Sequence, residues 1–170
     1  TGQDELCYHL NHPKYYVQAH RIFEIPYATN SLWPYLMEML FTLGLLVEGV
    51  GLAKLFHFTM YLLTAGAVYL FLKRFVSDRA SWYGFLVYAL TPFVYVQSAF
   101  AYVENGLSGF ILLSFYAIFL YLSERRLQWA MLAGVFGGFA AATKLIGLFV
   151  LPIFAVIYLH SFLKNDRKKE

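Results

Sequence analysis

Long intervals almost without charge constrain this sequence more than any other feature. Residues 80–123 contain one charged residue, Glu104, and residues 127–163 contain one, Lys144. Each interval is long enough for two crossings, because a helix needs about 20 apolar residues to span a hydrocarbon core of about 30 Å. The chain is 60% hydrophobic and 20% aromatic, with a mean hydropathy of +0.57, whereas soluble domains are roughly 45–50% apolar. We therefore predict an all-α polytopic membrane protein.

Five transmembrane helices are expected within a membrane domain over residues 52–163. The predicted spans cover residues 52–72, 82–101, 107–122, 127–143 and 145–163. The Thr91-Pro92 pair should bend the second span, because proline removes a backbone hydrogen bond and clashes with the preceding turn. Gly134 and Gly138, extended by Gly137 and by Ala140 to Ala142, should form a small-residue face that another helix can approach closely.

The region before these spans, residues 1–51, is expected to form a loop with short interfacial helices. Residues 36–50 are apolar enough to be a further span, but they contain Glu38 and Glu48. Burying an acid near the centre of a membrane helix costs roughly 2.5–3.5 kcal/mol on insertion scales. We therefore favour a helix that lies in the interface or is partly re-entrant.

The positions of the cations predict the orientation of the spans. With five crossings, three basic groups fall on one side of the membrane, and by the positive-inside rule that side is cytoplasmic. Residues 1–51, Glu104 and Lys144 would then face outward, and residues 164–170 would form a basic cytoplasmic tail. The three groups are Lys73, Arg74 and Arg79; Arg125 and Arg126; and Lys164, Arg167, Lys168 and Lys169.

A polar, titratable segment precedes the apolar part of the chain. Asp4 and Glu5 are adjacent, and Tyr8, His9 and Lys14 follow within ten residues. Neighbouring residues point in different directions on a helix or strand, so the two acids should divide roles rather than share a proton. One carboxylate could act as a general base, or could bind Mg²⁺ or Mn²⁺. An acidic first turn on a surface helix would explain the same pair without any function.

A short helix is expected near this segment. It would begin with Pro13 at its first position and run through residues 14–21, with Asn11 as its cap. His9 and His12 are three residues apart, but Pro13 should interrupt any helix through both of them. Neither histidine belongs to a zinc-binding array, so we do not expect a zinc site here.

Glu104 and Lys144 are the sharper candidates, because each is the lone charge of a predicted helical hairpin and lies at its outer turn. An ionisable residue isolated in a membrane domain is a functional candidate by default, although both side chains could also reach the interface and be solvated. Lys14 and Lys54 are further cations on the same predicted side. Such groups could hold a lipid phosphate and stabilise its charge as it leaves.

Other sites are excluded by what the sequence lacks. No phosphate-binding glycine loop, dinucleotide fingerprint or nucleophile elbow is present. The net charge is +3, and the cations cluster at loops and at the tail, which is not the distribution of a nucleic-acid-binding surface. The single cysteine, Cys7, rules out an intrachain disulfide.

Four segments together resemble the GT-C membrane glycosyltransferases of the protein-mannosyltransferase and aminoarabinose-transferase-like group. They are Asp4-Glu5-x-x-Tyr8-His9-Leu10-x-x-Pro13-Lys14-x-Tyr16; Pro34-x-x-x-Glu38-Met39-Leu40; Ala101-Tyr102-Val103-Glu104; and Gly134 through Ala142-Thr143-Lys144-Leu145-x-Gly147. No segment is diagnostic alone, but their order and topology agree. The family has a helix before its first outer loop and several later helices, so the resemblance implies that this chain is a fragment.

The resemblance also implies roles for particular residues. It places Asp4 at the acidic position that acts near the acceptor, with Glu5 beside it, and Glu104 at the later outer acid. Lys144 would bind the polyprenyl phosphate, with Lys14 and Lys54 as further candidates for that role. Tyr8 and His9 would lie at the substrate as neighbours of the acid pair. A divalent metal, if one is used, would be held by Glu104 and Asp4.

The sequence therefore predicts a glycosyltransferase that moves a sugar from a polyprenyl-phosphate donor to a glycan, lipid or protein acceptor. The reaction would take place on the outer face of a bacterial or archaeal cytoplasmic membrane. One alternative is a non-enzymatic carrier, flippase or assembly subunit, with the lone charges lining a pathway. Another is a ligase or polymerase that acts on a whole lipid-linked oligosaccharide. No nucleic-acid partner is expected.

Overall fold

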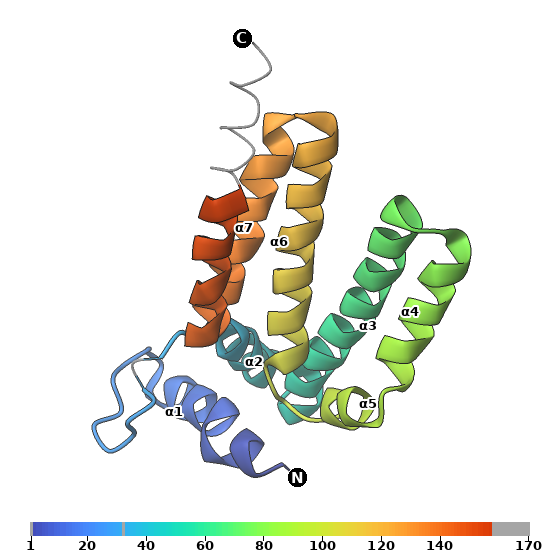
Figure 1. The fold of residues 1–170 in the computed structure, drawn as a ribbon. Coiled ribbons are helices and arrows are strands. Elements are labelled where there is room, and N and C mark those ends of the chain that lie inside the picture. The colour runs from blue at the N-terminus through green and yellow to red at the C-terminus, as the bar shows by residue number, and fades with distance from the viewer. Residues whose placement is uncertain (1, 32, 158–170) are drawn as a thin grey trace.

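The computed structural model describes residues 2–31 and 33–157, and all regular structure within them is helical (Figure 1). Two antiparallel helical hairpins stand side by side. The first pairs α3 (Val50–Phe75) with α4 (Asp78–Leu90), and the second pairs α6 (Glu104–Glu124) with α7 (Leu127–Thr143). The prediction of an all-α architecture is confirmed.

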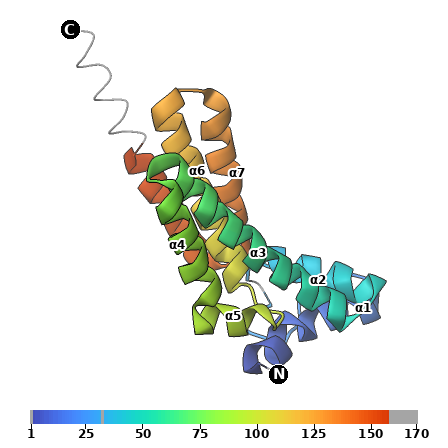
Figure 2. The same cartoon turned by 90° about the vertical axis from the view of Figure 1, so that its right-hand side faces the viewer.

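The shorter helices gather at the end of the molecule opposite the two hairpin turns (Figures 1 and 2). They are α1 (Asn11–Ala19), α2 (Leu36–Val47) and α5 (Pro92–Ser98). At the other end, the turn between α3 and α4 lies beside the turn between α6 and α7, where Arg74 Nη2 donates to Glu124 Oε1 at 3.3 Å. The predicted basic groups at these two turns therefore lie together. The third predicted group, residues 164–170, is outside the described residues.

Two helices are long and apolar enough to cross a membrane by length and composition, α3 and α6. At a rise of 1.5 Å per residue, the 26 residues of α3 extend about 39 Å, more than a hydrocarbon core of about 30 Å requires. Shorter apolar helices are Leu36–Val47, Leu127–Thr143 and Leu145–Ile157. The last of these begins with a 3-10 turn, η2 (Leu145–Phe149), and the remainder of the predicted fifth span lies outside the described residues.

The predicted second span, residues 82–101, is not one helix. α4 ends at Leu90, Thr91 is extended with ψ near 116°, and Pro92 is the first residue of the separate helix α5. Proline at a first helical position loses nothing, because its missing N–H would have no partner there. Pro92 therefore starts a new helix instead of bending an existing one, and α5 runs across the lower end of α4 (Figure 2).

The amino-terminal segment is helical through both histidines, contrary to the prediction that Pro13 interrupts it. A π-helical turn, η1 (Glu5–His9), precedes α1, and the Leu10 N–H donates to the Glu5 carbonyl at 2.9 Å. Pro13 is tolerated because it lies in the first turn of α1, where a missing backbone donor costs little. The helix ends at Ala19, where His20 turns the chain with a left-handed φ of 52°.

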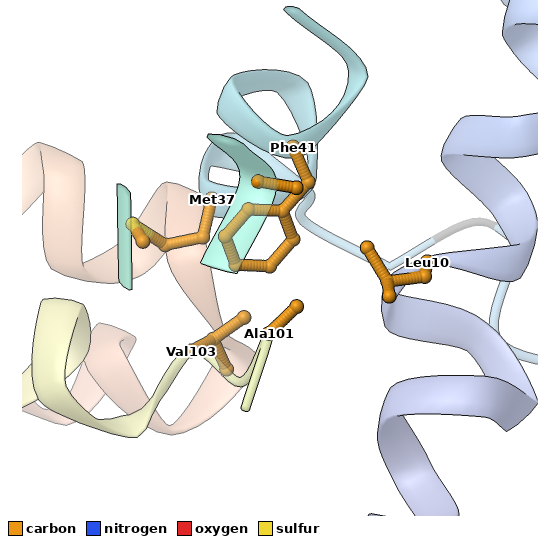
Figure 3. Close-up of a cluster of buried hydrophobic side chains, with 6 residues drawn as sticks. Leu10, Met37, Phe41, Ala101 and Val103 are labelled. Carbon is orange, nitrogen blue, oxygen red and sulfur yellow. The ribbon is translucent and has the colours of Figure 1, made fainter. Parts of the chain in front are cut away.

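A small apolar core fixes these elements to one another (Figure 3). α2 and α3 approach so closely that a Cβ on Gly44 would lie 2.7 Å from the Ala53 nitrogen. Burying such side chains gives roughly 25 cal/mol per Å² of apolar surface. The buried members of the core are Leu10, Met37, Phe41, Ala53, Ala101 and Val103.

The predicted small-residue face of α7 is confirmed at Gly137 and Ala140 but not at Gly134 and Gly138. Gly134 and Gly138 have open space around them within the described residues, whereas Gly137 contacts Phe154 and Ser114. The close-packed face lies one residue away in helical register and consists of Ala133, Gly137 and Ala140. The sequence showed that α7 has a small-residue face, but a run of small residues does not specify which of its faces is packed.

Candidate active site

The connection between α5 and α6, residues 99–103, lies at the centre of the charged end of the molecule. Its Ala101 N–H donates to Glu5 Oε1 at 2.9 Å, and the Lys54 ammonium lies 2.9 Å from the same oxygen. Glu5 is only 1% exposed. The predicted acid is therefore buried in a structural ion pair that joins η1, α3 and this connection.

The charge of Glu5 is stabilised by these contacts. Burial by itself would raise the pKa of the Glu5 carboxyl, but the hydrogen bond from Ala101 and the contact with Lys54 outweigh burial and lower that pKa. Glu5 is thus held as a carboxylate. A catalytic role for Glu5 stays a prediction.

Lys14 and Lys54 line one cavity, of about 280 Å³, together with Glu5. Lys144 does not reach this cavity. The structure therefore divides the cations that the sequence grouped as phosphate ligands into two places. The other residues that line this cavity are Leu6, Leu10, Asn11, Leu45 and Val50.

A second buried acid, Glu38 of α2, faces His9 of η1. His9 Nδ1 lies 2.7 Å from Glu38 Oε1, and both side chains are at most 3% exposed. The other carboxylate oxygen, Glu38 Oε2, is buried and has no hydrogen-bond partner among the described residues. Glu38 is thus buried in protein rather than in lipid. The cost of placing an acid in lipid, which argued against a membrane span over residues 36–50, therefore does not apply to Glu38.

Glu104 and Lys144 meet, although they are forty residues apart. Lys144 Nζ donates to Glu104 Oε1 at 2.9 Å, and the Val103 N–H donates to Glu104 Oε2 at 3.2 Å. Lys144 directly follows α7, and the turn after it packs tightly enough that a Cβ on Gly147 would collide with the Ala140 carbonyl. Both side chains of the pair remain 36% exposed, so they are accessible to a ligand.

A second cavity, of about 190 Å³, brings several of these groups together. Tyr8, His9 and Lys144 were all predicted site residues, and here they surround one space with Glu38, which was not. The remaining lining residues are Trp33, Pro34, Tyr35, Val103, Thr143, Leu145 and Ile146. We call this space the His9 cavity.

Asp4 is exposed and lies near the His9 cavity without lining it. Burial raises the pKa of Tyr8 to about 12, and the negative charges of Asp4, Glu104 and Glu38 add to the increase. Tyr102 lies against Gly2, and its pKa is raised by burial and by the charges of Asp4 and Glu5. Asp4 is thus electrostatically close to the aromatic rim of the cavity, and it is free of the ion pairs that occupy Glu5 and Glu104.

His57 of α3 hydrogen-bonds to both ends of the connection between α5 and α6. Its Nδ1 lies 2.8 Å from the Phe100 carbonyl oxygen, and its Nε2 lies 3.3 Å from the Asn105 nitrogen. A carbonyl only accepts and an N–H only donates, so the ring is the neutral tautomer with its hydrogen on Nδ1. Thr64 and Tyr88 add hydrogen bonds to the Asn105 carbonyl and side chain. His57 thereby fixes the segment that contacts Glu5 and carries Glu104.

A metal at Asp4 and Glu104 stays a prediction. Among residues 2–31 and 33–157, no group of three or more His, Cys, Asp or Glu side chains is arranged to hold a metal ion. Both oxygens of Glu104 already accept hydrogen bonds, from Lys144 and from Val103. Mg²⁺ or Mn²⁺ would have to displace the lysine or use oxygen atoms of a substrate.

Sequence reasoning missed Glu38 and His57 as parts of this site. Two signals in the sequence could have identified Glu38 as a site residue. It is an acid in an apolar helix, and it belongs to one of the segments that carry the family resemblance. His57 gave no signal, because a lone histidine within a long apolar helix does not indicate its partners. Only the fold brings it to the connection between α5 and α6.

The fold and this site define a class, that of helical membrane proteins with a charged cavity at one end of the bundle. The family model described as dolichyl-phosphate-mannose-protein mannosyltransferase matches residues 27–169, and the chain belongs to this family. It is an integral membrane glycosyltransferase of the GT-C type, whose donors are polyprenyl-phosphate sugars, as the sequence predicted. No curated protein and no solved structure matches the chain.

Proposed function

We propose that this protein transfers one sugar from a polyprenyl-phosphate donor to a hydroxyl group of a protein acceptor, on the extracytoplasmic face of the membrane. The family transfers mannose from dolichyl-phosphate-mannose to protein, which makes mannose the first sugar to test. The observation that carries the proposal is the meeting of Tyr8, His9 and Lys144 at one cavity, where Lys144 is paired with Glu104.

The proposal that the cavity faces the extracytoplasmic side is based on the charges at the two ends of the molecule. The turns that carry Arg74 and Arg126 lie together, and α1 and α2, which contribute residues to the charged cavities, lie at the opposite end (Figure 1). Basic turns favour the cytoplasmic side. The His9 cavity would then open at the outer face, where the sugar headgroup of a flipped polyprenyl-phosphate donor is presented.

The reaction we propose is a single inverting displacement. The acceptor hydroxyl oxygen attacks the anomeric carbon and forms the new glycosidic bond, while the bond from that carbon to the donor phosphate oxygen breaks. The hydroxyl proton passes to the Asp4 carboxylate, and the electron pair of the broken bond leaves with the polyprenyl phosphate. Asp4 is suited to this role because it is exposed and forms no ion pair among the described residues.

Lys144 would stabilise the leaving phosphate, whose charge grows as the bond breaks. Its ammonium is held by Glu104 and is still one third exposed, so it can contact an anion without first being pulled from the interior. Glu104 would therefore position Lys144, or orient the acceptor. Lys14 and Lys54 line the other cavity and would contact the lipid or the acceptor peptide outside the reacting centre.

The test uses the full-length protein in liposomes with polyprenyl-phosphate mannose and a serine- and threonine-containing peptide. Asp4→Asn should lower the transfer rate by about 10²–10⁴-fold, because general-base assistance is lost. Lys144→Met should lower it by about 10²–10³-fold, as loss of one charge-stabilising group does elsewhere. Asp78→Asn, at the opposite end of the molecule, should leave the rate unchanged.

Unchanged transfer by Asp4→Asn would remove Asp4 from the mechanism. Movement of the lipid across the membrane without any sugar transfer by the wild type would instead support the carrier or flippase alternative. Transfer of preassembled oligosaccharides, but not of the monosaccharide, would support the ligase alternative.

A further inference from the structure

Three buried polar side-chain atoms of the described residues have no hydrogen-bond partner, Glu5 Oε2, Glu38 Oε2 and Asn105 Nδ2, and only Glu38 belongs to the lining of the His9 cavity. A buried acceptor without a partner destabilises the fold, and more so when it is charged. A group that enters the cavity with a hydrogen to donate would remove that destabilisation.

His9 adds a second unused atom to the same wall. Its Nδ1 is bound to Glu38 Oε1, and no described residue hydrogen-bonds its Nε2. When Nδ1 carries the hydrogen, Nε2 is an acceptor. The cavity therefore presents two neighbouring acceptors, and a ligand rich in hydroxyl groups can donate to both.

The other walls suit a sugar ring rather than a second anion. Tyr8 and Trp33 pack edge to face, with ring centroids 6.2 Å apart, and provide an aromatic surface for the apolar face of a pyranose. The cavity has a volume of about 190 Å³, which is room for one monosaccharide ring. A buried carboxylate would repel a phosphate placed beside it.

We propose that Glu38, supported by His9, is a specificity-determining residue that accepts a hydrogen bond from one hydroxyl of the transferred monosaccharide. This inference rests on the proposed function, since it takes the His9 cavity as the place of the donor sugar. Lys144 lies in the same wall and would place the phosphate at the mouth of the cavity. Glu38 does not act on the reacting bond, and its contribution is to select and orient the sugar.

The test is the substitution Glu38→Gln combined with a panel of monodeoxy donors. The His9 Nδ1–H needs an acceptor, so the new amide turns its oxygen toward His9 and its NH₂ group toward the cavity. The pocket-facing atom thus changes from acceptor to donor with almost no change in volume. Glu48→Gln, on the exposed end of the same helix segment, is the matched control.

The wild type should transfer the normal sugar at least about tenfold better, in kcat/KM, than one particular monodeoxy analogue, because a site built to bind a hydroxyl rejects the analogue that lacks it. In Glu38→Gln that preference should fall to near one, because every donor that carries this hydroxyl loses kcat/KM while the analogue that lacks it does not. The preferences among the donors that carry it should be unchanged, and Glu48→Gln should behave as the wild type.

Equal losses on every donor would overturn the inference, because they would indicate a purely structural role, and so would no loss at all. If Glu38→Gln does not fold, as judged by thermal melting, His9→Asn tests the same wall and should affect the same deoxy position. Donor binding is measured in parallel by displacement of a labelled donor. A wild type that binds and discriminates the donors but transfers none refutes the proposed function and leaves the recognition by Glu38 supported.

Discussion

The two ends of the molecule use the same residue types in opposite ways. At the end with the hairpin turns, the Lys73–Asp78 and Arg74–Glu124 pairs are loose, at 3.8 and 3.3 Å, and their cations are more than half exposed. At the other end, Glu5–Lys54 and Glu38–His9 are closed, at 2.9 and 2.7 Å, and both carboxylates are buried. Exposed pairs contribute about 0–1 kcal/mol, whereas buried charges need their partners.

This difference separates topology from chemistry. Exposed cations at the hairpin turns are enough to orient helices in a membrane, since orientation depends on the side on which the charges lie and not on their contacts. Buried acids with defined partners are costly, and strongly perturbed groups cluster at functional sites. The end of the molecule that contains the charged cavities is therefore the one where costly buried charges indicate a functional site.

Among the variants that test this contrast, Lys54→Met should lower the free energy of unfolding most. It leaves the buried Glu5 carboxylate without its cation, and removal of one partner from a buried pair costs about 3–5 kcal/mol. The same substitution at Lys73, in an exposed pair, should cost no more than about 1 kcal/mol. Unfolding of the purified protein in detergent micelles, followed by circular dichroism, compares the two. Equal stabilities of the two variants would contradict the contrast between the ends.

A smaller effect is expected for His57→Phe, which keeps the ring volume but removes both hydrogen bonds to the central connection. Each backbone group left unpaired should cost about 1–3 kcal/mol in unfolding free energy. Transfer activity should fall as well, because the segment that carries Glu104 is no longer fixed. Activity that survives while stability falls would separate the role of His57 in folding from a role in positioning.

The smallest expected effect is a change in pH dependence for Glu5→Gln. The pKa of Glu5 is lowered in the folded protein, so its contribution to stability is complete above the ordinary value of 4.5 and is lost as the pH falls through the folded pKa. The variant lacks this titration. Its stability should therefore decline less steeply than that of the wild type below pH 4.5. Parallel curves for the two proteins, measured by thermal melting, would show that Glu5 is not a carboxylate stabilised by its partners.

The predicted site was partly visible in the sequence. Glu104 and Lys144 were found because each is alone in a long apolar interval, and a lone charge is conspicuous whatever its partner. Asp4 and Glu5 were found as neighbours, but the sequence did not show that Glu5 is buried against Lys54 while Asp4 is exposed. Adjacent residues point in different directions on any helix, and the tertiary contacts with Lys54 and Ala101 decide that Glu5 is the buried one.

Hydrophobicity alone determined that the chain is helical and built for a membrane, because satisfying backbone hydrogen bonds in lipid leaves long apolar segments few alternatives to the helix. The spacing of charges determined where polar chemistry could occur. Only the tertiary structure decided that Pro92 begins a separate helix, that Glu38 faces His9, and that His57 holds the connection before α6. Those outcomes depend on contacts between segments distant in sequence, whose energies exceed the local preferences that a sequence pattern reports.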